Sequence, residues 1–198
     1  MPDPTQHQPK PVTPPEPADP HPSDENRENV HNPAPGGDAH SAQEDRSQER
    51  IRTVMRVYSL PDQFGLVRTE AAAEGFGNME ELFCQWQDGS NRFNRPGELL
   101  AAAWIDDMLA GVGGVTEDII DPAALRVRRF YVRPIFRHSG VGRSIANFVL
   151  ETIRPLNRQT VLNTDTEGGA AFWEAMGFRR IDREKTTHVL RSAPPGKR

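Results

Sequence analysis

The stretch that decides the fold is Phe130-Tyr131-Val132-Arg133-Pro134-Ile135-Phe136-Arg137-His138-Ser139-Gly140-Val141-Gly142-Arg143. It predicts the end of a β-strand, a turn after Pro134, and a helix whose apolar side chains share one face from Val141 to Thr152. The first N–H groups of a helix have no intrahelical acceptor, and the aligned peptide dipoles place partial positive charge there. A strand, a turn and a glycine-bearing helix start therefore predict an anion-binding site.

The residues of the turn support this prediction. Gly140 and Gly142 let an anion approach the backbone without a Cβ in the way. Ser139 contributes a hydroxyl donor, and the arginines at both ends contribute positive charge. Two familiar phosphate motifs do not fit. The P-loop needs a lysine followed by Ser or Thr, and the dinucleotide fingerprint needs a third glycine where this chain has Ile145.

Outward from this stretch, hydrophobic periodicity predicts a strand, two helices, three strands, a helix, a strand, a helix and a strand. The expected strands cover residues 51–58, 99–105, 108–115, 125–132, 160–163 and 186–190. The expected helices begin near residues 62, 78, 141 and 164, and Gly177 follows the last of them as a left-handed residue. This order predicts an α+β domain.

The strand expected at residues 125–132 changes its apolar side part of the way along. Its apolar residues are at positions 125 and 127 and then at 130 and 132, so the parity shifts around Arg128-Arg129. One extra residue in a strand, a β-bulge, produces such a shift. A strand buried on both faces fits the pattern equally well, and the sequence leaves both interpretations open.

The two strands before it are expected to form a β-hairpin. Their apolar runs are separated by Asp106-Asp107, which suits the turn although the second residue is not the usual glycine. Gly111, Gly113 and Gly114 in the second strand indicate a bulge or a close approach of another chain segment.

Two blocks of the sequence, one at each side of the helix expected after Pro134, resemble those of a known family. Arg137-x-x-Gly140-x-Gly142 is similar to the Arg/Gln-x-x-Gly-x-Gly/Ala motif of the GNAT superfamily of N-acetyltransferases, and Phe130-Tyr131-Val132-x-Pro134 is similar to the stretch before it. Ala170–Phe178, which follows Gly142 after 27 residues, resembles the block with Phe-Tyr and Gly-Phe. The resemblance covers residues 50–194. It implies a GNAT-like mixed, mostly antiparallel central sheet flanked by helices.

The resemblance implies an N-acetyltransferase that moves an acetyl group from acetyl-CoA to an amine by direct transfer. Main-chain N–H groups of the turn would bind the CoA pyrophosphate. This assigns the cofactor site to Arg137, His138, Ser139, Gly140, Val141, Gly142 and Arg143. The main chain of Tyr131 and Val132 would pair with the pantetheine arm. The bulge would separate this strand from residues 160–163, and a free N–H would polarise the thioester carbonyl as an oxyanion donor.

Three positions depart from the family pattern, and one of them is Glu167, where members commonly have an Asn. His138 stands where members often have a further glycine, which binding through the backbone tolerates. Trp173 stands where a Tyr commonly protonates the leaving CoA thiolate, and an indole N–H is far too weak an acid for that step. Either another acid serves, or the thiolate leaves with little help.

A general base is expected to take the proton of the amine. Asp165, beside the expected cleft, is the first candidate, and Glu117 is the second. Each has a structural alternative, because Asp165 also suits the N-cap of the next helix and Glu117 suits a solvated strand end. The resemblance thus gives Asp165 and Trp173 as the candidate catalytic residues.

A second class of function stays open. It is a CoA-binding regulatory or interaction module with weak or lost catalysis, for which Trp173 is the main argument. For the enzyme, the resemblance implies a small-molecule or peptide amine as the acceptor. Arg92 and Arg95 lie in a loop where they could face an anionic acceptor, although exposed arginines are common.

The beginning of the chain differs in composition from the rest. Residues 1–50 hold 11 of the 18 prolines, and ten acidic against four basic residues. Such a stretch cannot bury enough apolar area to offset roughly 1–2 kcal/mol per residue of backbone ordering entropy. We therefore expect a disordered Pro-rich acidic tail at residues 1–49, one domain at residues 50–194, and a frayed C-terminus at residues 195–198.

The composition of the rest of the chain limits the classes of partner and the location that we expect. Beyond residue 50 the charge is 20 basic minus 18 acidic residues, or +2, which is too low to suggest nucleic acid. Cys84 is the single cysteine, so no disulfide or multi-cysteine metal site is expected, and its apolar helix predicts a buried thiol. No apolar run approaches the ~18 residues of a membrane span, and Met1-Pro2-Asp3-Pro4 does not resemble a signal peptide. We expect a cytoplasmic protein without metal or membrane partner, and a homodimer stays open.

Overall fold

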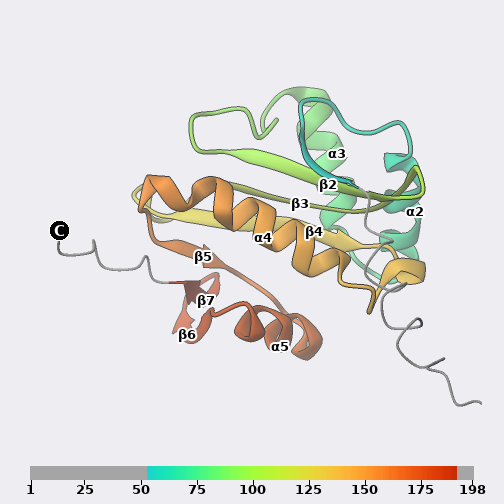
Figure 1. Cartoon of the computed structure of the whole chain (residues 1–198). Coiled ribbons are helices and arrows are strands. Elements are labelled where there is room, and N and C mark those ends of the chain that lie inside the picture. The colour runs from blue at the N-terminus through green and yellow to red at the C-terminus, as the bar shows by residue number, and fades with distance from the viewer. Residues whose placement is uncertain (1–52, 191–198) are drawn as a thin grey trace, which may run out of the picture. The chain divides into compact units, whose positions relative to one another are not determined.

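A seven-stranded sheet with the strand order β1-β2-β3-β4-β5-β7-β6 forms the centre of the structure, a computed structural model that describes residues 53–190 (Figure 1). Its strands are β1 (Thr53–Val57), β2 (Leu99–Ile105), β3 (Met108–Glu117), β4 (Leu125–Val132), β5 (Thr160–Leu162), β6 (Arg179–Arg183) and β7 (Thr186–Leu190). Only β4 and β5 pair in parallel, so the sheet is mixed and mostly antiparallel, as predicted. The tail expected at residues 1–49, the start of the first expected strand, and the end expected at residues 195–198 lie outside the described residues.

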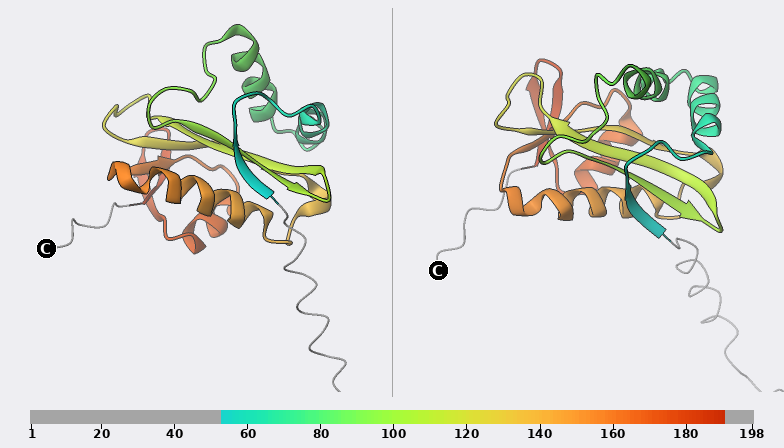
Figure 2. Two further views of the ribbon diagram at one scale, coloured as in Figure 1. Left: turned by 45° about the horizontal axis from the view of Figure 1, so that its top comes forward. Right: turned by 90° about the horizontal axis from the view of Figure 1, so that it is seen from above.

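Helices cover both faces of this sheet (Figure 2). They are α2 (Phe64–Ala73), α3 (Asn78–Asp88), α4 (Val141–Ile153) and α5 (Glu167–Ala175), with short 3-10 turns η1 (Pro134–Phe136) and η2 (Arg154–Leu156). On one face, α2 and α3 share a core with Leu100 and Leu109 of the hairpin. On the other face, Ile145 of α4 shares a core with Trp173 of α5. Each large apolar side chain buried in these cores stabilises the fold by about 1.5–3 kcal/mol.

Of the two interpretations left open for the parity shift in β4, the bulge is present, at Arg129. Val112 of β3 faces Tyr131, but Gly114 faces Arg128, so β4 has one more residue than β3 over this step. Arg129 has a φ of 60° and is the extra residue. The apolar side chains on both sides of the bulge consequently reach the same core, beside α4. They are those of Leu125, Val127, Phe130 and Val132.

The β2–β3 hairpin turns at Asp106 and Asp107, as predicted. Both residues have a positive φ, 48° and 62° respectively, which is the conformation that a type I′ turn requires. Aspartate adopts this conformation more readily than most residues with a side chain. The turn therefore forms without glycine.

Strand β6 is missing from the sequence prediction. Its five residues are exposed apart from the partly buried Ile181, so no apolar alternation marks them. The strand lies at the edge of the sheet, where charged side chains oppose pairing with another chain. Its main-chain pairing with β7 holds it in place, and a local pattern does not reveal such pairing.

Candidate active site

The N-terminus of α4 has the geometry of an anion-binding site. Gly140 is its N-cap, with a φ of 85° that would cost a residue with a side chain about 1–2 kcal/mol. The first main-chain hydrogen bond of the helix runs from the Ser144 N–H to the Gly140 carbonyl, at 3.0 Å. The N–H groups of residues 141–143 therefore have no acceptor within the helix, and they carry the positive end of its dipole.

The residues before Gly140 shape the turn. His138 is exposed and has a φ of 60°, a conformation in which glycine is favoured. This conformation is a physical reason for the glycine that the resembled family often has at this place. Ser139 donates its hydroxyl to the Phe136 carbonyl at 2.6 Å, so the hydroxyl closes the turn. Arg143, on the first turn of the helix, is exposed.

Two carboxylates, Glu70 in α2 and Glu74 directly after that helix, hold the segment that connects β4 to α4. The buried Arg133 donates to both carboxylate oxygens of Glu70, at 2.9 and 2.8 Å. Arg137 donates to both oxygens of Glu74, at 2.6 and 2.5 Å. Bidentate pairs of this kind fix the orientation of the guanidinium as well as its distance. Helix α2 thus positions the turn from the opposite face of the sheet.

Glu74 is expected to make a small, pH-dependent contribution to stability. Hydrogen bonds from Arg137 and then from Tyr131 lower the pKa of Glu74. A lowered folded-state pKa stabilises the protein above the unfolded-state pKa, and this contribution is lost as the pH falls through the folded-state value. Because the pair is partly exposed, Glu74→Gln should lower the free energy of unfolding by about 1 kcal/mol or less at neutral pH. At an acid pH, below the folded-state pKa of Glu74, the loss should be smaller.

Urea unfolding at both pH values measures this difference. Glu151, exposed on α4, offers a matched control, since Glu151→Gln should change the stability equally little at both. A loss of the same size at neutral and at acid pH for Glu74→Gln would contradict the role given to its ionised carboxylate.

Strands β4 and β5 separate beyond the bulge. Their parallel ladder ends at the pair of Val127 and Leu162, and Figure 1 shows the two strands diverging from there toward the end of β4. A bulge bends its strand, and here it lies directly after the last paired residues. The remaining edge of β4 therefore has no partner strand, although two of its carbonyls accept side-chain hydrogen bonds. Asn78 donates to the Phe130 carbonyl at 3.3 Å, and Nε of Arg137 donates to that of Val132 at 3.1 Å. An extended ligand can pair with this edge through its N–H groups, as in β-strand addition.

The register of β4 determines which residues present main-chain groups at that edge. The Arg133 N–H donates to the Ala110 carbonyl at 2.9 Å. Antiparallel ladders alternate between pairs that exchange hydrogen bonds and pairs that do not. By this alternation the main chain of Tyr131 is directed to β3. The main-chain N–H of Val132 is directed to the edge that lacks a partner strand, and we infer the same for the N–H of Phe130, which lies at the bulge.

The structure brings the two sequence blocks together at the start of α4. A Cβ placed on Gly142 would lie 3.5 Å from Cγ2 of Val132 and 3.6 Å from Cε2 of Phe172. The neighbouring Trp173 is buried and packs edge-to-face on Phe130, with ring centroids 4.8 Å apart. One region is thus bordered by the glycine of the first block, the edge of β4 and the aromatic pair of the second block.

Asp165 lies exposed in the segment between β5 and α5. Its carboxylate accepts a hydrogen bond from Nδ2 of Asn163 at 3.0 Å. The N-cap of α5 is Thr166, whose hydroxyl oxygen accepts from the Gly169 N–H at 3.1 Å. The N-cap interpretation of Asp165 is therefore wrong, because the helix begins one residue later.

Sequence reasoning missed a group of polar side chains at the bulge. Asn78, at the start of α3, donates to the Phe130 carbonyl at 3.3 Å, and its Oδ1 is buried without a hydrogen-bond partner among the described residues. Arg129 donates to Glu81 at 2.8 Å and to Gln85 at 3.2 Å. The bond from Arg129 lowers the pKa of Glu81. No local signal marks these residues, since their contacts depend on where α3 packs on the sheet.

Three expectations from composition concern the single cysteine, metal binding and membrane-spanning helices. Cys84 is exposed, with its Sγ 3.7 Å from Oε1 of Glu80, so the prediction of a buried thiol is wrong. The helix buries Met79 and Leu82 instead. Within residues 53–190, no three His, Cys, Asp or Glu side chains are grouped so as to hold a metal ion. In the same range, every helix is too short or too polar to cross a bilayer.

Solved structures share this architecture. One from Exiguobacterium sp. 255-15, assigned as an acetyltransferase, has 24% identity and a TM-score of 0.64 over 70% of this chain and 92% of that one. A GNAT family N-acetyltransferase from Escherichia coli in complex with CoA has 16% identity and a TM-score of 0.54, over 73% and 83%. A GNAT family acetyltransferase from Brucella melitensis in complex with acetyl-CoA has 16% identity and a TM-score of 0.52, over 72% and 90%. These likenesses show the fold.

The sequence itself identifies the family. No curated protein matches the chain. A family model described as an acetyltransferase (GNAT) domain matches residues 67–194, which span both blocks and the helix between them. The chain therefore belongs to the GNAT family of acetyltransferases.

Proposed function

We propose that the protein is an N-acetyltransferase that takes its acetyl group from acetyl-CoA and transfers it directly to an amine. The observation that carries the proposal is the meeting of the β4 edge with the free N–H groups of α4 beside Gly142. The structural relatives from E. coli and B. melitensis hold CoA and acetyl-CoA, which supports the same ligand here.

In this proposal the CoA pyrophosphate binds at the start of α4. Its oxygens accept the N–H groups of residues 141–143, and the positive end of the helix dipole adds about 0.3–1 kcal/mol. The turn formed by Arg137, His138, Ser139 and Gly140 sets the distance between helix and ligand. Arg143 is exposed beside it and adds positive charge.

The pantetheine arm pairs with this edge of β4 through the N–H groups of Phe130 and Val132, since both carbonyls already accept hydrogen bonds from side chains. Tyr131 supports the site in another way, because its hydroxyl donates to Glu74 at 2.6 Å and Glu74 holds Arg137. The Phe130 N–H is the proposed donor to the thioester carbonyl. A preorganised donor at such a position stabilises the transition state by about 3–4 kcal/mol.

Trp173 packs against the reacting strand, and the proposal gives it no proton to donate. Its ring centroid lies 4.8, 4.9 and 5.3 Å from those of Phe130, Phe172 and Phe178. A free thiol has a pKa of about 8.5, so a thiolate is stable enough near neutral pH to leave without a proton donor. The ring fixes Phe130, and through it the strand that holds the thioester.

Asp165 is the proposed acceptor of the amine proton. Its carboxylate is exposed and does not cap α5, so it is available to take a proton directly or through water. Asp165→Asn keeps the shape and removes the basicity, and we expect it to lower kcat/KM for the amine by about 100-fold. The Kd for CoA should not change. Thiol release with an amine that the wild type acetylates, together with titration of CoA, measures both.

Glu167, exposed in the first turn of α5, is the control for a change of charge at the same end of that helix. Glu167→Gln should leave kcat/KM near the wild-type value. If Asp165→Asn also retains wild-type activity and the same pH profile, the proton goes elsewhere. Glu117, whose carboxylate lies 3.4 Å from Arg158, is then the next group to replace.

A second candidate function is a CoA-binding module with weak catalysis, which the replacement of the usual tyrosine by the buried Trp173 favours. Two measurements separate the candidates. Thermal unfolding with and without CoA reports binding, and thiol release from acetyl-CoA across a panel of amines reports transfer. Stabilisation by CoA with turnover of an amine supports the enzyme, whereas stabilisation without any turnover supports the module.

A further inference from the structure

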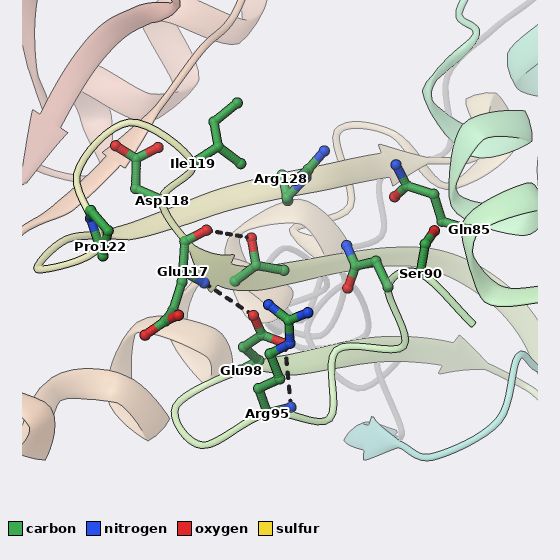
Figure 3. A pocket seen from close by; sticks show the side chains of 11 residues that line it. Gln85, Ser90, Arg95, Glu98, Glu117, Asp118, Ile119, Pro122 and Arg128 are labelled. Atoms are coloured by element: carbon green, nitrogen blue, oxygen red, sulfur yellow. Dashed lines mark hydrogen bonds between the residues drawn. The ribbon is translucent and has the colours of Figure 1, made fainter. Parts of the chain in front are cut away.

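A cavity of about 310 Å³ lies on the α3 side of the sheet (Figure 3). Its wall includes Gln85 of α3, Asn91 and Arg95 of the loop after that helix, Glu117 at the end of β3, and Arg128 of β4. This volume is at the lower end of the range for small-molecule pockets. Polar and charged groups dominate the wall, so charge decides what the cavity can bind.

The cavity adjoins the position proposed for the thioester. Arg128, in its wall, comes directly before the bulge at Arg129, and Phe130 comes directly after it. Two strand residues span roughly 7 Å. Both arginines face α3, since Arg129 donates to Glu81 at 2.8 Å and Arg128 lies 3.9 Å from the same carboxylate. A small amine in the cavity would therefore lie beside the part of β4 that is proposed to hold the thioester.

Each carboxylate in the wall already has a partner. Asp118 is buried and accepts from Arg126 at 2.6 Å. Glu98 accepts two main-chain N–H groups, at 3.3 and 3.2 Å. Glu117 lies 3.4 Å from the guanidinium of Arg158. The negative charges of the wall are thus largely compensated before any ligand enters.

The guanidinium of Arg128 lacks such compensation. It forms no hydrogen bond within residues 53–190, and the carboxylate 3.9 Å away, that of Glu81, is already bound by Arg129. Burial, and then the positive charge of Arg129, lower the pKa of Arg128. A cation that is desolvated and repelled by its neighbour would gain from an incoming anion.

Arg95 is a second cation at the cavity. Figure 3 shows its side chain projecting into the same space from the side of Glu98. Of the two loop arginines noted in the sequence, only this one lines the cavity. Arg92 folds back onto α3, where its Nε donates to the Trp86 carbonyl at 3.0 Å.

We propose that this cavity binds the acceptor and that the acceptor is an amine bearing a carboxylate, which Arg128 binds. A planar guanidinium matches the two oxygens of a carboxylate. Glu98, whose charge is met only by main-chain N–H groups, would repel a phosphate dianion more strongly than a singly charged acid. The inference rests on the proposed acetyl transfer, because the amine must reach the thioester at Phe130.

The test compares pairs of amines that differ only in a carboxylate: phenylalanine with phenethylamine, tryptophan with tryptamine, and lysine with cadaverine. Thiol release from acetyl-CoA gives kcat/KM for each. The wild type should favour the acid in at least one pair by about tenfold or more. Arg128→Gln should remove that preference, and Arg128→Lys should restore part of it, since lysine keeps the charge but loses the bidentate geometry.

Two controls separate binding of the acceptor from damage to the fold. Arg92→Gln removes an arginine that does not line the cavity, and it should keep the wild-type preference. Arg128→Gln should bind CoA normally and unfold at the same or a higher temperature than the wild type, because Arg128 has no hydrogen bond to lose within the described range. A purely structural arginine would instead lower stability and reduce the rates of both members of a pair equally.

The outcomes also separate this inference from the proposed function. If Arg128→Gln keeps the wild-type preference, or if a protein that binds CoA acetylates none of the three acids, the inference is overturned and the CoA site stands. If the wild type does not bind CoA, the proposed function itself is overturned.

Discussion

Gly142→Glu is expected to raise the Kd for CoA at least about 100-fold, which corresponds to roughly 2.7 kcal/mol. A Cβ at this position points between Val132 and Phe172, at 3.5 and 3.6 Å. A glutamate would extend from there into the space proposed for CoA. Its carboxylate would also compete with the pyrophosphate for the N–H groups at the start of α4. Calorimetric titration of CoA into both proteins measures the effect.

Gly142→Ala is the matched control. Its new Cβ would make only ordinary van der Waals contacts, from 3.5 to 3.7 Å, and the position is outside the left-handed region. Alanine is also the better helix former. We expect this variant to fold and to bind CoA with an affinity close to that of the wild type. Equal affinity of the glutamate variant would show that the pyrophosphate binds elsewhere.

Gly113→Ala is expected to lower the free energy of unfolding by about 1–3 kcal/mol and to reduce acetyl transfer as well. A Cβ on Gly113 would lie 2.6 Å from two carbons of the Phe130 ring, closer than real contacts allow. The ring cannot move away freely, because it packs edge-to-face on the buried Trp173. The clash would therefore displace β4, the strand that is proposed to hold the thioester.

Gly168→Ala tests whether this loss is specific to the contact. Gly168 lies exposed in α5 with no atom within 4 Å of its added Cβ, so alanine there should stabilise the helix by up to about 1 kcal/mol. Urea unfolding and thiol release, measured on both variants, give the comparison. Wild-type stability of Gly113→Ala would mean that the ring of Phe130 is free to move, contrary to the packing described.

The hairpin turn was predictable, and the bulge was one of two interpretations that the sequence allowed, because the causes of both are local. Side chains alternate along a strand, so an extra residue at Arg129 leaves a parity shift in the sequence itself. Asp106 and Asp107 are among the residue types that tolerate positive φ. Strand β6 was not predictable in this way, because its side chains are exposed and only its main chain pairs with β7.

The candidate site was predictable where the main chain forms it. A glycine N-cap and the free N–H groups after it follow from the residues between Arg137 and Arg143 alone. The side chains that reach this region from other elements, such as Glu74 and Asn78, depend on how α2 and α3 pack. The choice of Phe130 over Tyr131 for the main-chain contacts likewise depends on the register of β4 with β3, which no local pattern encodes.

The structure of the protein with bound CoA is the most direct test of the central claim, that β4 and α4 together form the CoA site. The claim predicts pyrophosphate oxygens about 3 Å from the N–H groups of residues 141–143. It also predicts a pantetheine arm that pairs with the main chain of Phe130 and Val132. A pyrophosphate bound away from α4, or a pantetheine arm that pairs with another strand, would contradict it.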